Sequence, residues 1–146
     1  MFTTNFDVIV GEHDITNSSD GTRHQQCRGM NHPNYGDLSQ NSNDFAIVHL
    51  RQSVQIGTRA APACLPTASL GGDFLDGETM TVSGWGRNSS GGSSPQVLHS
   101  VDVPGITNSE CSNSYPFETI TSSMLCAGNV INGGIDSCQG DSGGKK

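Results

Sequence analysis

The chain has 146 residues and a formal net charge of -7, which fits one domain and argues against nucleic acid or an anionic membrane as its partner. Hydrophobic residues make up 32% of the sequence, and no apolar run approaches the roughly 18 residues that a membrane-spanning helix needs. Five cysteines and two Asn-x-Ser sequons, Asn17–Ser19 and Asn88–Ser90, favour a secreted, extracellular protein.

Short apolar runs bounded by Gly, Pro, Asn and Ser clusters predict strands rather than helices. The predicted strands are Val8–Val10, Phe45–Leu50, Thr79–Val82, Val97–Val103 and Met124–Ala127. Turn-rich segments are expected at residues 16–23, 31–43, 87–95 and 129–134. The strand at Phe45–Leu50 is expected to be buried or to alternate between a buried and an exposed face. This pattern predicts an all-β sandwich or barrel.

One short helix is expected near residues 107–113. Thr107 and Glu110 have the spacing of a capping box, in which each side chain bonds to the backbone N–H of the other residue. Pro116 follows soon afterwards, so the helix should last only a turn or two.

The sequence Gly-Asp-Ser-Gly-Gly at residues 140–144 is suited to a nucleophile. Glycines permit a tight turn and let a substrate carbonyl approach the backbone. The amides of Gly140 and Ser142 could converge on one point and form an oxyanion hole. The alternative interpretation is a Gly-rich surface turn that carries an ordinary serine.

Several segments together resemble the trypsin-like, chymotrypsin-family serine proteases. They are DSCQGDSGG at 136–144, NDFAIVHL at 43–50, PACLP at 62–66, VSGWG at 82–86 and ITSSMLCAG at 120–128. The resemblance implies a double antiparallel β-barrel. It assigns residues 8–55 to the first barrel, 56–78 to the connection and 79–144 to the second barrel.

The resemblance also implies roles for individual residues. Ser142 would be the nucleophile, Gly140 and Ser142 would supply the oxyanion-hole amides, and Asp44 would orient the catalytic histidine. Asp136 would lie at the base of the specificity pocket, where a carboxylate pairs with a substrate Arg or Lys. Asp141 would bind the N-terminal ammonium that zymogen cleavage creates. The implied activity is trypsin-like endopeptidase cleavage of protein or peptide substrates after Arg or Lys.

The catalytic histidine is the missing member of this set. The family motif Ala-Ala-His-Cys does not occur, and the spacing of about 45 residues before Asp44 would place it ahead of Met1. The histidines that are present are expected to be surface or satisfied side chains: His13, His24, His32, His49 and His99. The chain as given is therefore expected to be inactive. The alternative is a non-catalytic protease homologue that acts as a binding or regulatory protein.

The cysteines are assigned by the same resemblance. Cys111 and Cys126 would form a disulfide within the second barrel, and Cys138 would pair with a cysteine outside this sequence. Cys64 resembles the cysteine that links a light chain or propeptide in two-chain members. Cys27 has no partner that can be assigned from the sequence.

No cofactor is expected, although one loop resembles the calcium loop of the family. Glu12, Asp14 and Asp20 are hard oxygen ligands of the kind that calcium prefers. Arg23 stands near the place of the closing acid, so a solvated acidic loop is favoured over a metal site.

Overall fold

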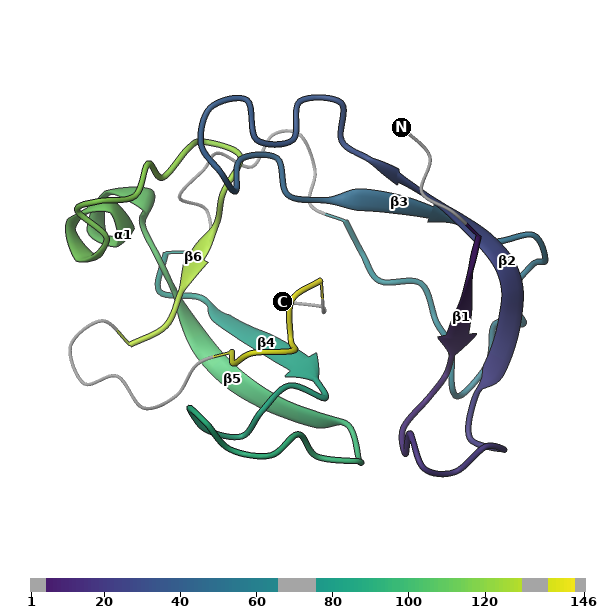
Figure 1. Ribbon diagram of the computed structural model, residues 1–146. Coiled ribbons are helices and arrows are strands. Elements are labelled where there is room, and N and C mark those ends of the chain that lie inside the picture. The colour runs from purple at the N-terminus through teal and green to yellow at the C-terminus, as the bar shows by residue number, and fades with distance from the viewer. Residues whose placement is uncertain (1–4, 66–75, 130–136, 144–146) are drawn as a thin grey trace.

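Two antiparallel sheets, each of three strands, make up most of the fold. The computed structural model describes residues 5–65, 76–129 and 137–143. The first sheet contains, in spatial order, β1 (Phe6–Val10), β2 (Thr22–Asn31) and β3 (Ala46–His49). The second contains β4 (Thr79–Gly84), β5 (His99–Ile106) and β6 (Cys126–Ala127). The two sheets lie side by side, with the helix α1 at the outer end of the second sheet (Figure 1).

The central strand of the first sheet, β2, is the one that the sequence pattern did not predict. Its sequence TRHQQCRGMN is mostly polar, and only His24, Cys27 and Gly29 are buried along it. It pairs with β1 through Val8↔His24 and with β3 through Met30↔Ile47. Its first part pairs with β1 and its last part with β3, so the strand forms without an alternating apolar pattern.

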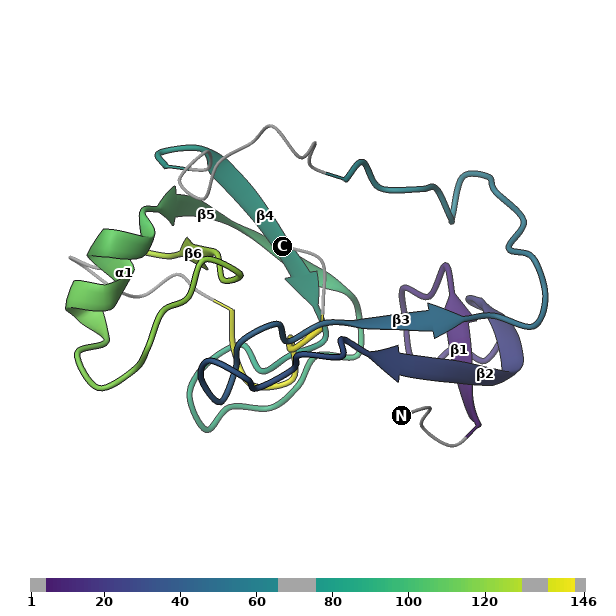
Figure 2. The same ribbon diagram turned by 90° about the horizontal axis from the view of Figure 1, so that it is seen from above.

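The prediction that the strand near Phe45–Leu50 is buried or alternating was wrong. The observed strand β3 spans Ala46–His49 and is exposed at all four positions. Among the described strands, β3 lies at the edge of the sheet and pairs with β2 alone. Figure 2 shows β3 as the outer strand, from which the chain continues towards β4.

The pairing of β4 with β5 in the second sheet is more regular than the pairing of β1 with β2, which contains a register shift. Strand β4 pairs with β5 over six residue pairs, from Thr79↔Pro104 to Gly84↔His99. Val82 and Val103 lie within this pair and are only 4% and 1% exposed. The predicted strand at Met124–Ala127 shrinks to β6, because the Met124 amide donates to the Thr121 carbonyl in a turn.

The helix α1 spans Asn108–Ser114 and confirms the predicted capping box. The Glu110 amide donates to Thr107 Oγ1 at 3.1 Å, and the Thr107 amide donates to Glu110 Oε2 at 3.3 Å. A disulfide between Cys111 and Cys126 fastens the helix to β6. The helix end at Tyr115 precedes Pro116, as the sequence suggested.

The hydrophobic core within the described residues is small. Only Cys27, Val82, Val103 and Cys111 are buried among the apolar side chains. Large apolar side chains of the first sheet and its flanks stay exposed: Phe6, Ile9, Met30, Phe45, Ile47 and Val48. No helix in the described ranges is both long enough and apolar enough to cross a membrane.

Candidate active site

The segment that carries Ser142 forms a tight turn. Gly140 and Gly143 adopt φ angles of 102° and 79°, which favour glycine, and the Asp141 amide donates to the Cys138 carbonyl at 3.0 Å. Ser142 is exposed at the end of this turn. No hydrogen bond from the amides of Gly140 or Ser142 to another described residue is formed.

The Asp141 carboxylate fixes this turn to the end of β4. Its Oδ1 accepts a hydrogen bond from the Gly86 amide at 2.8 Å, and its Oδ2 accepts one from the Cys138 amide at 2.9 Å. A Cβ atom on Gly84 or Gly86 would overlap the carboxylate. Both glycines of the Gly-Trp-Gly sequence are therefore needed for Asp141 to lie where it does.

Replacement of Gly86 by alanine is expected to destabilise the folded chain by about 1–3 kcal/mol, the usual cost of overpacking. The added methyl group displaces the Asp141 carboxylate and breaks its bond to the residue 86 amide. Urea denaturation monitored by circular dichroism measures the change. Gly57→Ala is the control, because a Cβ there meets no atom within 4 Å. Equal midpoints for the two variants would contradict the assigned packing.

A cavity of about 510 Å³ lies beside Asp141. Its lining includes Gly84, Gly86, His99, Ser137, Cys138 and Asp141. His99 thus shares a cavity with the nucleophile segment, but it makes no hydrogen bond to Ser142 or Asp141 within the described ranges.

Asp44 lies in the loop just before β3 and is exposed. Its neighbour Asn43 ties this loop to the second half of the chain, since the Asn43 amide donates to Ser123 Oγ at 3.2 Å across 80 residues of sequence. No hydrogen bond or ion pair joins Asp44 to the turn at residues 140–143 among the residues that the structure describes. In the predicted triad a histidine lies between the aspartate and the serine, so a direct bond between them is not required.

The five histidines lie in separate places. His24 is buried on β2, and neither of its ring nitrogens has a hydrogen-bond partner. The His32 ring contacts the Phe45 ring in a tilted arrangement, with 4.5 Å between ring centroids. The remaining three are exposed: His13, His49 and His99. In the described part of the chain, none of the five is hydrogen-bonded to Ser142 or Asp44.

Two positions of the predicted site cannot be placed. Asp136, the predicted specificity determinant, and Gly144 lie outside the described residues.

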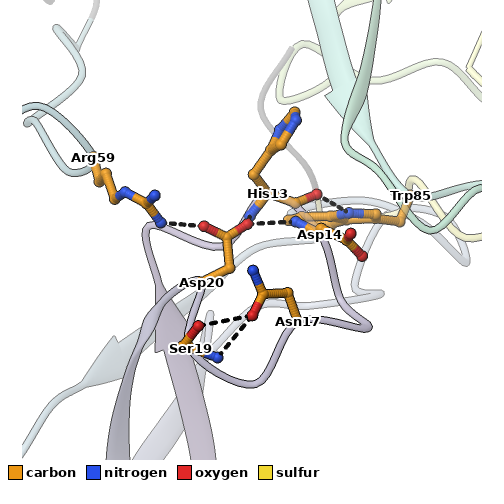
Figure 3. A network of polar contacts seen from close by, with 7 residues as sticks. All are labelled: His13, Asp14, Asn17, Ser19, Asp20, Arg59 and Trp85. Atoms are coloured by element: carbon orange, nitrogen blue, oxygen red, sulfur yellow. Dashed lines mark hydrogen bonds and ion pairs between the residues drawn. The ribbon is translucent and has the colours of Figure 1, made fainter.

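The three acidic residues of the 11–21 loop do not form one cluster. Asp20 is buried, and its Oδ2 accepts the amides of His13 and Asp14 at 3.1 Å and 2.7 Å, while its Oδ1 accepts from the Arg59 guanidinium (Figure 3). Asp14 Oδ1 instead accepts from the amide and the hydroxyl of Thr16. Within the described ranges no group of three acidic, histidine or cysteine side chains could hold a metal ion. The third acid, Glu12, differs from both, because its Oε1 is buried and has no hydrogen-bond partner among the described residues.

These contacts also set the ionisation of Asp20. The pKa of its carboxyl lies below the ordinary value, chiefly because the Asp14 amide donates to it, and the Arg59 guanidinium acts in the same direction. A depressed pKa means that the ionised form stabilises the fold. That stabilisation is complete above the ordinary Asp pKa of about 3.9 and is lost as the pH falls through the lower folded-state value.

Two residues near the site were not singled out from the sequence. The Trp85 indole Nε1–H donates to the His13 carbonyl at 3.1 Å, and Arg59 pairs with Asp20 across 39 residues. Trp85 lies in a segment that carried the family resemblance, so a sequence signal was present for it. No local pattern marked Arg59.

Comparisons with known proteins agree with this arrangement. A family model described as Trypsin matches residues 2–144. "Serine protease 1" of Rattus norvegicus is 40% identical over 140 residues, which cover 94% of this chain and 54% of that protein. "Trypsin" of Phaedon cochleariae is 35% identical over 142 residues, which cover 97% of this chain and 53% of that protein. "Serine proteinase stubble" of Drosophila melanogaster is 37% identical over 144 residues, which cover 94% of this chain and 18% of that protein.

The chain spans about half the length of the first two of these relatives. The two antiparallel sheets and the one short helix of its described residues are consistent with part of a trypsin-like double β-barrel. With a family match over nearly all of its residues, the chain belongs to the trypsin family of serine proteases.

Proposed function

We propose that this chain is part of a serine endopeptidase in which Ser142 is the nucleophile. The observation that carries the proposal is the Asp141 carboxylate, which two backbone amides hold in place so that the next residue, Ser142, is exposed on a glycine turn. The Ser142 hydroxyl would attack the scissile carbonyl and pass its proton to a histidine. The amides of Gly140 and Ser142 would stabilise the resulting oxyanion.

The acyl-enzyme mechanism then proceeds by proton transfers through the same histidine. The histidine donates its proton to the departing amine, and the acyl group stays on Ser142. A water molecule, deprotonated by the histidine, attacks the acyl carbon and releases the acid product. In this proposal Asp44 orients the histidine, and Asp141 binds the ammonium group that zymogen cleavage exposes. The cavity beside Asp141 supports the last assignment.

The histidine is proposed to lie in a longer form of the protein. Support comes from the relatives, of which this chain covers about half, and from the absence of an Ala-Ala-His-Cys sequence among these 146 residues. We therefore expect this chain alone to lack peptidase activity. The boundaries proposed from the resemblance are 8–55 and 79–144 for the two barrels. Strands β2 to β6 fall within them, whereas β1 begins at Phe6, two residues before the first boundary.

The non-catalytic alternative has one observation in its favour. None of the five histidines of this chain bonds to Ser142 or Asp44 in the part that the structure describes. A longer form with another residue in place of the motif histidine would be a binding or regulatory protein. A longer form with Ala-Ala-His-Cys would be the enzyme.

Specificity for Arg and Lys is proposed to come from Asp136. In the longer protein, Asp136→Ser is expected to lower kcat/KM for substrates with Arg or Lys before the scissile bond by about 10²- to 10³-fold, because it removes the partner of a desolvated cation. Peptide substrates that differ only at that residue measure the change. Cleavage of Phe and Leu substrates should be preserved in the variant. Unchanged kcat/KM for Arg substrates would refute the assignment.

A disulfide-linked partner and a secreted, extracellular location are also proposed from the family resemblance. Cys64 is exposed and is not disulfide-bonded within the described residues, so it could join a light chain or propeptide. The disulfide and the two sequons are suited to a secreted, extracellular protein.

A further inference from the structure

An ion pair between Arg59 and Asp20 joins two segments that are distant in the sequence. Arg59 belongs to the connection that follows β3, and Asp20 closes the loop between β1 and β2 (Figure 3). The Asp20 side chain is 7% exposed, whereas that of Arg59 is 66% exposed. The guanidinium therefore reaches from solvent onto a buried carboxylate, whose charge would be costly without a partner.

The connection and the loop also pack closely beside this pair. A Cβ atom on Gly11 would lie 3.0 Å from the Arg59 carbonyl oxygen, and Gly11 adopts a φ of 77°. Arg59 is thus held near the loop by its backbone as well as by its charge.

The same carboxylate organises the part of the loop that touches Trp85. Asp20 accepts the His13 amide, and the His13 carbonyl accepts both the Trp85 indole N–H at 3.1 Å and the Leu98 amide at 2.8 Å. The Ile15 amide adds a bond to the Gln96 carbonyl at 3.0 Å. The loop of the first sheet is therefore joined to the second sheet at the residue that Asp20 holds.

Trp85 is connected to the nucleophile segment through its neighbour in the sequence, Gly86. It is flanked by Gly84 and Gly86, and the Gly86 amide donates to the Asp141 carboxylate. A continuous set of bonds thus runs from Arg59 through Asp20 and Trp85 to the residue before Ser142.

We propose that the Arg59–Asp20 ion pair, called the clasp below, stabilises this loop in the way that a bound cation would, because the guanidinium carries the positive charge. The clasp thereby positions Trp85 and the Gly84–Gly86 turn against Asp141. Arg59 and Asp20 are positioning residues, since neither is part of the proposed catalytic set. The proposal goes beyond the peptidase assignment and does not require Ser142 to be catalytic. It is offered in place of a calcium ion, since Asp14 accepts from Thr16 and Asp20 accepts from Arg59 and the Asp14 amide.

The single tryptophan of the chain reports on the clasp directly. In the 146-residue chain, Arg59→Gln is expected to move the fluorescence emission maximum of Trp85 to longer wavelength and to increase its quenching by acrylamide. The reason is that the His13 carbonyl is no longer held in place to accept the indole N–H. Hydrogen exchange at the His13 and Asp14 amides should rise in the same variant. Arg59→Lys retains the charge and should keep the emission near that of the unaltered chain.

Arg23→Gln is the matched control. Arg23 forms a comparable surface ion pair with Asp7 at 3.1 Å, and neither residue bonds to the Trp85 contacts. Native emission in Arg59→Gln, or equal shifts in Arg59→Gln and Arg23→Gln, would overturn the proposal. Should circular dichroism show that Arg59→Gln is unfolded, Arg59→Lys decides: native emission supports the clasp, and an unfolded Lys variant contradicts it.

Calcium provides the opposing test. With about 1 mM CaCl₂, in the range of extracellular calcium modules, the emission and the thermal midpoint of the unaltered chain should equal those in EDTA. A rise of the midpoint with calcium that Glu12→Gln abolishes would show that a metal holds the loop, and the clasp would be rejected.

Discussion

A fluorophosphonate probe is expected to label Ser142 in a longer form of the protein that contains the histidine motif, and to react with this 146-residue chain about 10⁴- to 10⁶-fold more slowly. Labelling forms a bond from serine Oγ to phosphorus and expels fluoride, so it requires a serine whose proton can be removed. Loss of one triad member removes most of that activation. Mass spectrometry of the labelled peptide measures both the site and the rate.

Ser142→Ala in the longer protein is the control, and it should abolish labelling. Strong labelling of the 146-residue chain at Ser142 would show that one of its own five histidines, or another base, activates the serine. Absence of labelling in a longer protein that does contain Ala-Ala-His-Cys would favour the non-catalytic homologue.

Removal of the disulfide between Cys111 and Cys126 is expected to lower the free energy of unfolding of the chain by about 3 kcal/mol. The bridge spans 15 residues of sequence, and closing a loop of this length restricts the unfolded chain by roughly that amount. It also fastens α1 to β6, whose two residues pair only with Gly105 and Ile106. The double variant Cys111→Ala/Cys126→Ala, compared by urea denaturation, measures the loss.

Cys64→Ser provides the reference for this experiment, because Cys64 is an exposed free cysteine and its replacement should leave the midpoint unchanged. If the double variant matched Cys64→Ser in stability, the bridge would contribute nothing, and the anchoring of α1 would have to come from the capping box and from Asn108. The Asn108 side chain donates to the Thr121 and Met124 carbonyls.

The elements that depend on local interactions were predictable from the sequence. The capping box at Thr107 and Glu110 lies within one turn, so the sequence located α1 to within a residue. Strand β4 was likewise recognised from its β-branched and apolar residues. Strand β2 was missed because its polar residues are stabilised by pairing with β1 along its first part and with β3 along its last part, and no window of its own sequence contains these partners.

In the candidate site, too, the features that depend on local sequence were predictable and the contacts between distant residues were not. Ser142 and its glycine turn were evident from five consecutive residues, and the family resemblance supplied a role for Asp141. The amides that hold Asp141 come from Cys138, three residues away, and from Gly86, 55 residues away. The Arg59–Asp20 pair and the Trp85–His13 bond span 39 and 72 residues. Contacts of that range depend on how distant segments of the chain fold together, and no spacing in the sequence encodes them.

The exposed strand β3 has a consequence for handling the isolated chain. Among the described strands it pairs only with β2, so no described strand pairs with the backbone donors and acceptors of its other edge, and its sequence Ala-Ile-Val-His contains no Asp, Glu, Lys or Arg. Edges of this kind are templates for strand addition between copies, which natural proteins suppress with lysine, proline or a covering segment. Aggregation during expression is therefore expected to begin at β3, and a lysine at Ile47 is the simplest way to improve solubility without disturbing the nucleophile turn.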